Sequence, residues 1–421
     1  MTATAPFRGG LQVGNTLYAG YNGQLYTLNS DGEITLLTTL ASTDNIFIAR
    51  NNAATTNIAF LYNSGTALYL NVGSTALTTF TGLTGTPSAL WSHLGYLMYG
   101  YGNGDIWSSD LNGTTFNSLN KARTESNPDG VVNGFSYNGQ MYVMGEKTVE
   151  VWGDPTNASG FPLTRIGFNI LPGLKAAHAV TGWQEEFGNP PIWVGSDNTV
   201  RQLNGYAAEK ISPPDLDRLI ADVVFPDTQL EAVCYIAAGH AFWQLNGPDW
   251  SWVFNLNNKT WHERKSHLSD KSRFHRSVFA FDKSLVGDTN SSDLWRLDYT
   301  LTEEAGSPLT AIMESGPVKD FPNRQRIRRA DFDFTPGVGL ASSSDIESDP
   351  TALIEVSKDG GKTWPLSYVR HLGKIGETQQ RIFVLNAGLS GDEGARWRWS
   401  ISDPVHVGFV GGTMETEVET K

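Results

Sequence analysis

The sequence is poor in several features that would indicate other classes of protein. It contains one cysteine, Cys234, which excludes an internal disulfide framework and suits folding in a reducing cytoplasm. No apolar run approaches the roughly 18 residues of a membrane-spanning helix, so we expect no membrane span. The first residues, MTATAPFRGG, lack a charged segment followed by an apolar core, so we expect no signal peptide.

Charge is also scarce, since Asp, Glu, Lys and Arg make up 18% of the chain, and the net charge is −13. A protein that grips nucleic-acid phosphates over a broad surface carries a basic face, which this composition argues against. A protein past which a polyanion slides is not excluded. The sequence also has no Gly-x-Ser-x-Gly, His-Glu-x-x-His or Walker-type loop. We therefore expect no catalytic residue and no cofactor.

Aromatic residues are abundant, at 11%, and are accompanied by many Gly, Asn and Thr residues, which is typical of an all-β protein with tight turns. Stretches such as GNTLYAGYNGQLYTLN and GYLMYGYGNGDIWSSDLNG repeat one plan of short strands and hairpin turns. The repeats recur roughly every 40–50 residues, the spacing of four-stranded propeller blades. The sequence predicts a β-propeller of six or seven irregular blades over residues 1–304. Alignment on an expected inner-strand motif places seven residues at equivalent points: Tyr26, Tyr69, Trp107, Trp152, Gln202, Val253 and Trp295.

Two further elements are expected. A short helical insertion is predicted near residues 212–224, with Ser212 as N-cap, prolines in the first turn, and an apolar face of Leu216, Leu219, Ile220 and Val223. After about residue 300, long stretches alternate apolar and polar residues, as strands with one solvated face do. We expect a second all-β domain over residues 305–421, a β-sandwich or barrel that can also supply a strand to the propeller.

One motif, SKDGGKTW, matches the Asp-box pattern Ser-x-Asp-x-Gly-x-Thr-Trp found on propeller blades of sialidases and other glycoside hydrolases. In an Asp box the Ser and Asp side chains tie a hairpin turn and the Trp packs on the blade, so the box stabilises and does not catalyse. Two degenerate relatives, DLNGTTF and NLNNKTW, share a turn followed by Thr and an aromatic residue. We interpret the box as a structural turn formed by Ser357, Asp359, Gly361, Thr363 and Trp364.

Two basic segments are candidates for binding. NRQRIRRADFDF places Arg324, Arg326 and Arg328 on one strand face, as a candidate subunit or partner interface or a stripe that tracks phosphates. The alternative is a solvated strand balanced by nearby carboxylates. HERKSHLSDKSRFHR, residues 262–276, holds three histidines but no acidic or cysteine ligand at fixed spacing. We expect a basic exposed loop there and no metal site.

Four stretches, taken in their order, resemble one family. They are GEKTVEVWGDP with the following FPLTRIGFNILPGLKAAHAV, then PIWVGSDNTVRQLNGYAAEKISPPDLDRLI, SKDGGKTWPLSYVRHLGKIGETQQRIFVLNAG and RWSISDPVHVGFVGGTMETE. They are similar to the packaged-DNA stabilisation proteins of short-tailed bacteriophages, the tail hub or nozzle. The similarity spans roughly residues 140–420, and the N-terminal blades resemble the family only in texture.

This resemblance implies a structural virion protein of the phage tail, assembled in the host cytoplasm, and not an enzyme. Such hubs form a homo-oligomeric ring, a hexamer, below the portal and adaptor, retain packaged DNA and form the conduit for genome ejection. Contacts with a tail needle or tip and with tail fibres or tailspikes are also implied. Double-stranded DNA would pass without sequence-specific binding. The chain is shorter than the larger family members, which leaves its lateral partners open.

Two other functions stay open as alternatives: a sialidase-like propeller glycoside hydrolase, and a glycan-binding or receptor-binding tail propeller. Hydrolysis would need an acidic pair with a tyrosine or arginine cluster at the blade centres. The repeats place apolar or small polar residues there. A receptor-binding propeller would expose aromatic platforms on loops, for which Trp250 and Trp252 are candidates.

Overall fold

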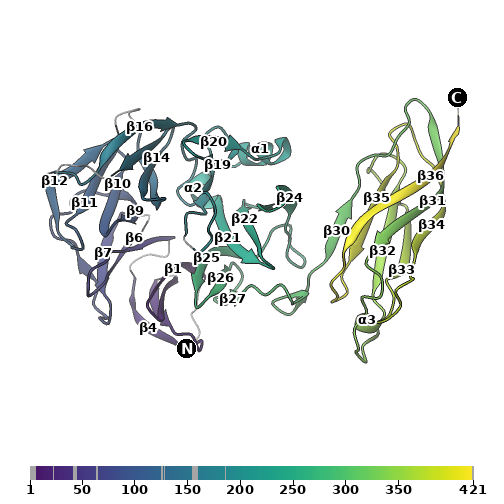
Figure 1. The fold of residues 1–421 in the computed structure, drawn as a ribbon, viewed down its shortest axis with the longest axis horizontal. Helices are drawn as coiled ribbons and strands as arrows, with labels where there is room; N and C mark the ends of the chain where they lie inside the picture. Colours follow the sequence, from purple (N-terminus) through teal and green to yellow (C-terminus); the bar gives the residue numbers. More distant parts are fainter. Residues whose placement is uncertain are drawn as a thin grey trace. The chain divides into compact units, whose positions relative to one another are not determined.

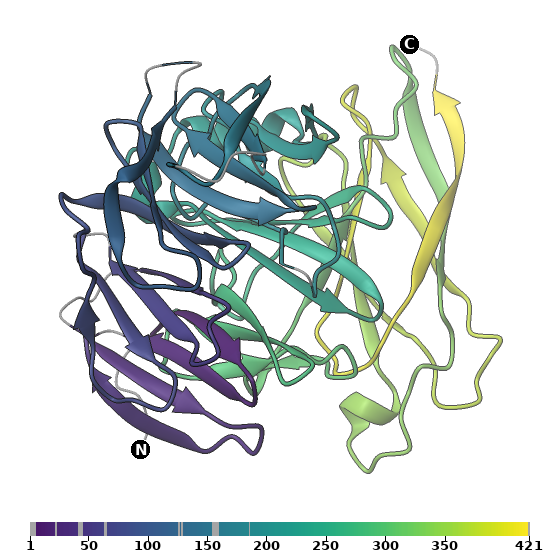
Figure 2. The same ribbon diagram turned by 60° about the vertical axis from the view of Figure 1, so that its left-hand side comes forward.

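The structure, a computed structural model, describes residues 6–419 except for 22, 41–44, 63–64, 125–126, 128, 154–159 and 185. The chain divides into two compact units, Met1–Lys265 with Ser269–Asp298, and Ser266–Leu268 with Tyr299–Lys421. Both units are built almost entirely of strands (Figures 1 and 2). No helix in the described part of the chain is long and apolar enough to cross a membrane.

In the described part of the chain, the first unit contains seven antiparallel sheets, or blades, each made of strands that are consecutive in the chain. Many of these strands are labelled in Figure 1. Blade 1 comprises β1 (Phe7–Val13), β2 (Thr16–Tyr21), β3 (Gln24–Leu28) and β4 (Ile34–Thr39). Blade 2 comprises β5 (Ile46–Arg50), β6 (Asn57–Tyr62), β7 (Ala67–Asn71) and β8 (Thr78–Thr79). Blade 3 comprises β9 (Pro87–His93), β10 (Tyr96–Tyr101), β11 (Asp105–Ser109) and β12 (Phe116–Arg123). Blades 4 and 5 comprise β13 (Val131–Tyr137), β14 (Gln140–Gly145), β15 (Val149–Gly153) and β16 (Thr164–Ile170); and β17 (Val180–Thr181), β18 (Ile192–Val194), β19 (Val200–Asn204) and β20 (Ala207–Lys210). Blades 6 and 7 comprise β21 (Glu231–Ala237), β22 (His240–Asn246), β23 (Ser251–Asn255) and β24 (Thr260–Glu263); and β25 (Phe274–Ala280), β26 (Lys283–Asp288) and β27 (Leu294–Arg296). The β-propeller predicted from the repeats is confirmed, and it has seven blades.

The first strand of each blade lies innermost, because these strands contact one another from blade to blade, and β25 contacts β1 to close the ring. We call this closing contact the seam. His275 Nε2 donates to the carbonyl of Phe7 at 2.6 Å, and the Phe281 N–H donates to Gln12 Oε1 at 2.8 Å. Among the strands of the described residues, none from beyond residue 304 pairs with these seven sheets. Side-chain contacts, and not a shared strand, therefore close the ring.

Burial within a blade follows the position of the strand. The second strands of blades 1 to 4 are almost continuously buried, because neighbouring blades cover both of their faces. Outer strands such as β12 are largely exposed. The inner-strand interpretation of the repeat motif is wrong, since all seven aligned residues lie on third strands. In blades 1 and 2 the aromatic motif residue of the third strand is paired with a small residue of the second strand: Tyr26 with Ala19, and Tyr69 with Ala59.

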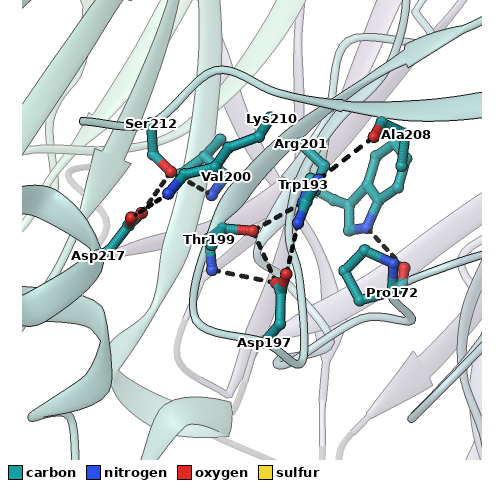
Figure 3. A network of polar contacts seen from close by, with 10 residues as sticks. All are labelled: Pro172, Trp193, Asp197, Thr199, Val200, Arg201, Ala208, Lys210, Ser212 and Asp217. Carbon is teal, nitrogen blue, oxygen red and sulfur yellow. Dashed lines mark hydrogen bonds and ion pairs between the residues drawn. The ribbon is translucent and has the colours of Figure 1, made fainter. Parts of the chain in front are cut away.

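Between blades 5 and 6 the chain forms two short helices, α1 (Pro214–Ala221) and α2 (Pro226–Gln229). Leu216 and Ile220 of α1 are buried in one cluster with Val200 and Trp243. The expected N-cap at Ser212 is wrong, because Pro213 occupies that position and makes no side-chain cap. Ser212 Oγ instead accepts from the Val200 N–H at 2.9 Å and donates to Asp217, which ties α1 to blade 5 (Figure 3).

The second unit is a sandwich of two sheets, which confirms the predicted class of the C-terminal region. Its strands are β28 (Glu303–Glu304), β29 (Ser307–Pro308), β30 (Ala311–Glu314), β31 (Arg324–Phe334), β32 (Thr351–Ser357), β33 (Leu366–His371), β34 (Ile382–Leu389), β35 (Arg396–Ile401) and β36 (Phe409–Glu419), with one short helix, α3 (Asp345–Ser348). One sheet has the order β30-β35-β32-β33 and the other β34-β31-β36, while β28 and β29 form a separate hairpin. Alternate residues of β31, β32 and β35 fill the core, including Phe332, Ile354 and Trp397.

Candidate functional site

A cavity of about 400 Å³ lies at the centre of the propeller and is lined by residues of the innermost strand of every blade. We call it the axial cavity. Its wall combines aromatic side chains with polar ones, including His178 and Arg276. Trp183 stacks on Phe135 with the ring centroids 5.0 Å apart. The expectation of only apolar or small polar residues at the blade centres is therefore wrong. The cavity has the size of a small-ligand pocket.

Charged groups beside the axial cavity link blades 1, 6 and 7, and the amide of Asn45 joins them from the start of blade 2. Arg276 Nη2 lies 3.6 Å from Glu231 Oε1, and Asn45 Nδ2 donates to the same oxygen at 2.6 Å. Burial acts to raise the pKa of Glu231, but the interactions with Arg276, His275 and Arg8 and the hydrogen bond from Asn45 outweigh it and lower the pKa overall. The Glu231 carboxylate is therefore ionised at neutral pH. It draws basic residues of blades 1 and 7 toward blade 6.

A bulge in the innermost strand places Arg276 in this cluster. The pairing of β25 with β26 shifts register between His275 and Ser277, and Arg276 between them has a φ of 47°. Such a φ is uncommon for a residue other than glycine, and bulges redirect the side chains they carry. In β1 the register shifts between Phe7 and Gly9, so Arg8 occupies the equivalent point. Thus β1 and β25, which are neighbours at the seam, each contain a bulge that sets the direction of an arginine side chain.

Two other titratable side chains line the axial cavity without any sign of reactivity. Burial, and then the charge of Arg276, hold the pKa of His178 well below its ordinary value, so the ring is neutral; it packs on Phe47 at 4.6 Å. Cys234 is buried and lies 3.2 Å from Thr181 Oγ1, and burial raises the pKa of its thiol to about 11. A thiol with so high a pKa is not a nucleophile at neutral pH.

The basic segment 262–276 is largely exposed in its first half, as its composition indicates, and is buried toward its end. His275 is 4% exposed, and its neighbour Phe274 is also buried. Arg273 forms an ion pair with Asp288, whose side chain is fully buried. The segment runs into β25, and closure of the ring buries its last residues against β1. No group of three or more His, Cys, Asp or Glu residues suited to a metal ion occurs in the described ranges.

The Asp box forms the loop between β32 and β33. Ser357 Oγ donates to Asp359 Oδ1 at 2.7 Å and accepts from the Gly361 N–H at 2.8 Å. Asp359 also accepts from the Thr363 N–H at 2.9 Å and from the Thr363 hydroxyl at 2.6 Å. These hydrogen bonds, led by that of Ser357, hold the pKa of Asp359 well below its ordinary value. The guanidinium of Arg398 lies over the Trp364 ring, 4.2 Å from its centroid. All four acceptor contacts are internal to the turn.

Two propeller turns use a related device, in which the acceptor lies two residues before the threonine where the box has four. In the relative NLNNKTW, Asn258 Oδ1 accepts from the Thr260 N–H at 3.1 Å and from its hydroxyl at 2.6 Å. In blade 5, Asp197 Oδ1 accepts from the Thr199 N–H at 3.2 Å and from its hydroxyl at 2.7 Å (Figure 3). An acidic or amide side chain two residues before a threonine is thus a recurrent turn device in this chain.

Arg324, Arg326 and Arg328 lie on β31, and all three are exposed. Each has an acidic partner: Asp392 at 3.4 Å, Glu419 at 3.0 Å and Glu417 at 2.6 Å, respectively. Glu417 and Glu419 belong to the adjacent strand β36, so two of the pairs form a ladder across neighbouring strands. The arginine charges on this face are therefore balanced within the sandwich.

Comparison with known proteins identifies one family. The model of the family described as "Bacteriophage P22 Gp10, beta-propeller" matches residues 1–302. The match includes the N-terminal blades and ends before the last two stretches that carried the resemblance. No curated protein sequence matches the chain. Among solved structures, the computationally designed Ika8 protein is similar over 70% of this chain and 87% of its own, with 12% identity and a TM-score of 0.42.

Proposed function

The chain belongs to the phage stabilisation family of Bacteriophage P22 Gp10 β-propellers, as predicted, and we propose that it forms the tail hub, or nozzle, of a short-tailed phage. In this proposal a ring of six copies lies below the portal and adaptor, retains the packaged DNA and surrounds the path of ejection. The ring is part of the virion and is assembled in the host cytoplasm. The family match over residues 1–302 is the observation that carries the proposal.

The size of the axial cavity supports a conduit made by several copies. A volume of about 400 Å³ is that of a pocket for a small ligand. A B-form duplex, whose major groove alone is about 12 Å wide, does not fit through it. Trp183 and Phe135 also occupy part of the cavity wall. Double-stranded DNA would therefore have to pass between subunits, with the net charge of −13 disfavouring tight binding to its phosphates.

Ring formation requires two different faces on each copy, because a closed ring is held by heterologous contacts. We propose residues 1–304, with the insertion near 212–224, and residues 305–421 as the two domains that supply them. Arg324, Arg326 and Arg328 are the proposed subunit or partner interface, where acidic partners would exchange with those within the chain. A tail needle or tip and tail fibres or tailspikes are the further proposed partners. The Asp box at Ser357–Trp364 would have a structural part only.

The test is assembly. We expect the purified chain, or the chain mixed with isolated portal–adaptor complexes, to give a six-fold ring in negative-stain images and a hexameric mass under native conditions. A chain that stays a monomer and never joins a portal complex would contradict the proposal. Assay on a panel of sialosides is the matching control, since turnover there would favour the glycoside hydrolase alternative. Of the described residues that line the axial cavity, none is the tyrosine that such an enzyme needs.

A further inference from the structure

The axial cavity contains an arginine whose hydrogen-bonding groups are largely unused. A guanidinium carries five N–H donors. Arg276 lines the cavity, and its one ion pair within the described ranges is with Glu231, at 3.6 Å between Nη2 and Oε1. Its Nε and Nη2 are buried and have no hydrogen-bond partner among the described residues. Buried donors without acceptors are costly, so a ligand that supplies acceptors would be stabilised here.

The positive charge of Arg276 is compensated only in part. Its side chain is 14% exposed, so it is largely withdrawn from water, and a cation in that position needs a close anion. Glu231 is the anion present, but it lies beyond hydrogen-bond distance, and its Oε1 already accepts from Asn45 at 2.6 Å. Arg50 and Glu186 also line the cavity, have opposite charges and are both exposed, so solvent screens them. The buried wall therefore offers one cation to an entering anion.

Aromatic side chains form another part of the wall. The rings of Phe135 and Trp183 are nearly parallel, at 11°, with their centroids 5.0 Å apart. Trp183 and Phe279 both line the cavity and are half-buried, so part of each side chain is open to a ligand. A further ring gains both apolar burial and stacking there. The cavity volume of about 400 Å³ is sufficient for a small molecule with one ring.

We propose that the axial cavity binds a small aromatic carboxylate, with the carboxylate on Arg276 and the ring against Trp183. The planar guanidinium matches a carboxylate with two charge-assisted hydrogen bonds. An inorganic anion would leave the aromatic wall without a partner, an amine would be repelled by Arg276, and a neutral ring would leave the N–H donors unused. This ligand site goes beyond the proposed part of the chain in a tail ring, and it is formed within one propeller.

Binding would be coupled to the contact between blades 6 and 7. Arg276 belongs to blade 7 and Glu231 to blade 6. The ligand carboxylate would share the Arg276 guanidinium with Glu231, and the two anions would repel each other. Removal of Glu231 should therefore tighten ligand binding, although it destabilises the protein. A ligand that binds only the folded propeller also raises its unfolding temperature as the ligand concentration increases.

The first experiment compares a series of probes by calorimetry and by thermal unfolding at matched ionic strength. The probes are phenylacetate, the neutral phenylacetamide, the cationic phenethylamine, and acetate, which lacks the ring. We expect phenylacetate to bind roughly ten- to a hundredfold more tightly than phenylacetamide, the usual difference when a hydrogen bond gains a charge. Acetate and phenethylamine should also bind more weakly than phenylacetate, because each lacks one of the two matching features.

Variants then test the two parts of the site. We expect Arg276→Gln to weaken phenylacetate binding roughly ten- to a hundredfold and Trp183→Leu roughly two- to tenfold. Arg201→Gln is the matched control, because Arg201 lies on β19, is partly buried in an ion pair with Asp197 and does not line the cavity. Glu231→Ala should bind phenylacetate several-fold more tightly. Such a gain does not arise from partial unfolding, which would weaken binding.

The proposal is overturned if phenylacetate binds no more tightly than phenylacetamide, a comparison that needs no variant. It is also overturned if Arg201→Gln loses as much affinity as Arg276→Gln, or if folded Glu231→Ala protein binds phenylacetate no more tightly than the unchanged protein. Circular dichroism of each variant without ligand establishes that it is folded before binding is measured. Failure of ring assembly would leave these results unaffected, so the ligand site and the tail ring are tested independently.

Discussion

Both units pair arginines with carboxylates, and the pair of Arg276 and Glu231 in the propeller is much more buried than the pair of Arg326 and Glu419 in the sandwich. The side chains of Arg276 and Glu231 are 14% and 15% exposed, whereas those of Arg326 and Glu419 are 44% and 43% exposed. Water and salt screen the second pair and leave it little net energy. The first pair is only partly solvated, so removal of one partner leaves the other charge uncompensated. The same kind of ion pair is therefore expected to contribute more to stability in the propeller than in the sandwich.

The difference follows from what holds the strands together in each place. In the sandwich, β31 and β36 already form a long antiparallel ladder of backbone hydrogen bonds, to which Arg326 and Glu419 add an outer contact. At the seam, β1 and β25 belong to different sheets. His275 makes a connection there through its hydrogen bond to the Phe7 carbonyl, and the pair of Arg276 and Glu231 connects the equally separate sheets of blades 7 and 6. Charges are placed inside the protein where the backbone cannot bridge the gap.

Replacement of Glu231 by Ala should have the largest effect. It leaves Arg276 without its carboxylate, and we expect a loss of about 3–5 kcal/mol in the free energy of unfolding. Urea unfolding followed by tryptophan fluorescence measures this. The surface counterpart is Glu417→Ala, since Glu417 is exposed and pairs with Arg328. Equal losses in the two variants would show that burial does not decide the value of these pairs.

Two glycines extend the comparison to packing. A Cβ added at Gly134 on β13 would lie 2.5 Å from atoms of the Trp91 ring, so Gly134→Ala should cost about 1–3 kcal/mol through overpacking. A Cβ at Gly411 on β36 would meet nothing within 4 Å. Gly411→Ala should therefore stabilise the sandwich by about 0.4–1 kcal/mol, because the unfolded chain loses freedom. Thermal unfolding of both variants checks the opposite signs.

The two units should also differ in their response to acid. Burial holds the pKa of both His178 and His275 below the ordinary value of 6.5. As the pH falls below 6.5 the unfolded chain therefore takes up protons first, and the propeller loses up to about 1.4 kcal/mol per pH unit and histidine. The pKa of Asp359 in the sandwich is depressed from 3.8, so its contribution is lost only below that pH.

Hydrogen exchange of peptides from each unit between pH 7 and pH 5 separates these responses. Propeller peptides should lose protection first. His178→Phe removes one titrating group from the contact with Phe47 and should flatten the pH dependence. A sandwich that loses protection before the propeller would contradict the assignment.

The smallest effect is expected for Arg326→Ala. The pair with Glu419 is exposed, and we expect a loss of about 0.2–1 kcal/mol that shrinks further as salt is added. Unfolding in low and high salt measures both quantities. A larger loss that is insensitive to salt would show that the arginine ladder is more than a solvated surface pair.

Local sequence patterns were sufficient for the repeats and not for the seam. Tyr26, Tyr69 and Trp107 recur because the third strand of each blade pairs with the second strand of the same blade. Both strands lie within one sequence repeat, so the pattern is visible in a single repeat. The turn residues of the Asp box are likewise close together in the sequence. Such features depend on residues a few positions apart, so the sequence predicts them.

The contacts of the charged residues at the seam cannot be predicted from neighbouring residues in the sequence. Phe7 and His275 are 268 positions apart, yet they share a hydrogen bond. The segment before β25 has the composition of an exposed basic loop, and only ring closure buries its end. The bulge that redirects the Arg276 side chain has no signature in the surrounding sequence either. The strand alternation of the C-terminal unit, in contrast, was visible because each strand has one face in the core.

The seam, which no shared strand bridges, determines where the propeller would open under mechanical tension. Its seven blades form a linear series of modules bent until the two ends touch. Backbone pairing does not join β1 to β25. The chain runs directly from each blade to the next but does not connect blade 7 to blade 1. Tension applied between Pro6 and Asp298 would load that junction before any blade is unravelled. The propeller would then open between blades 7 and 1, while the other six junctions between blades stay intact. A circular permutation that moves the chain ends to another blade boundary would move the point of opening with them.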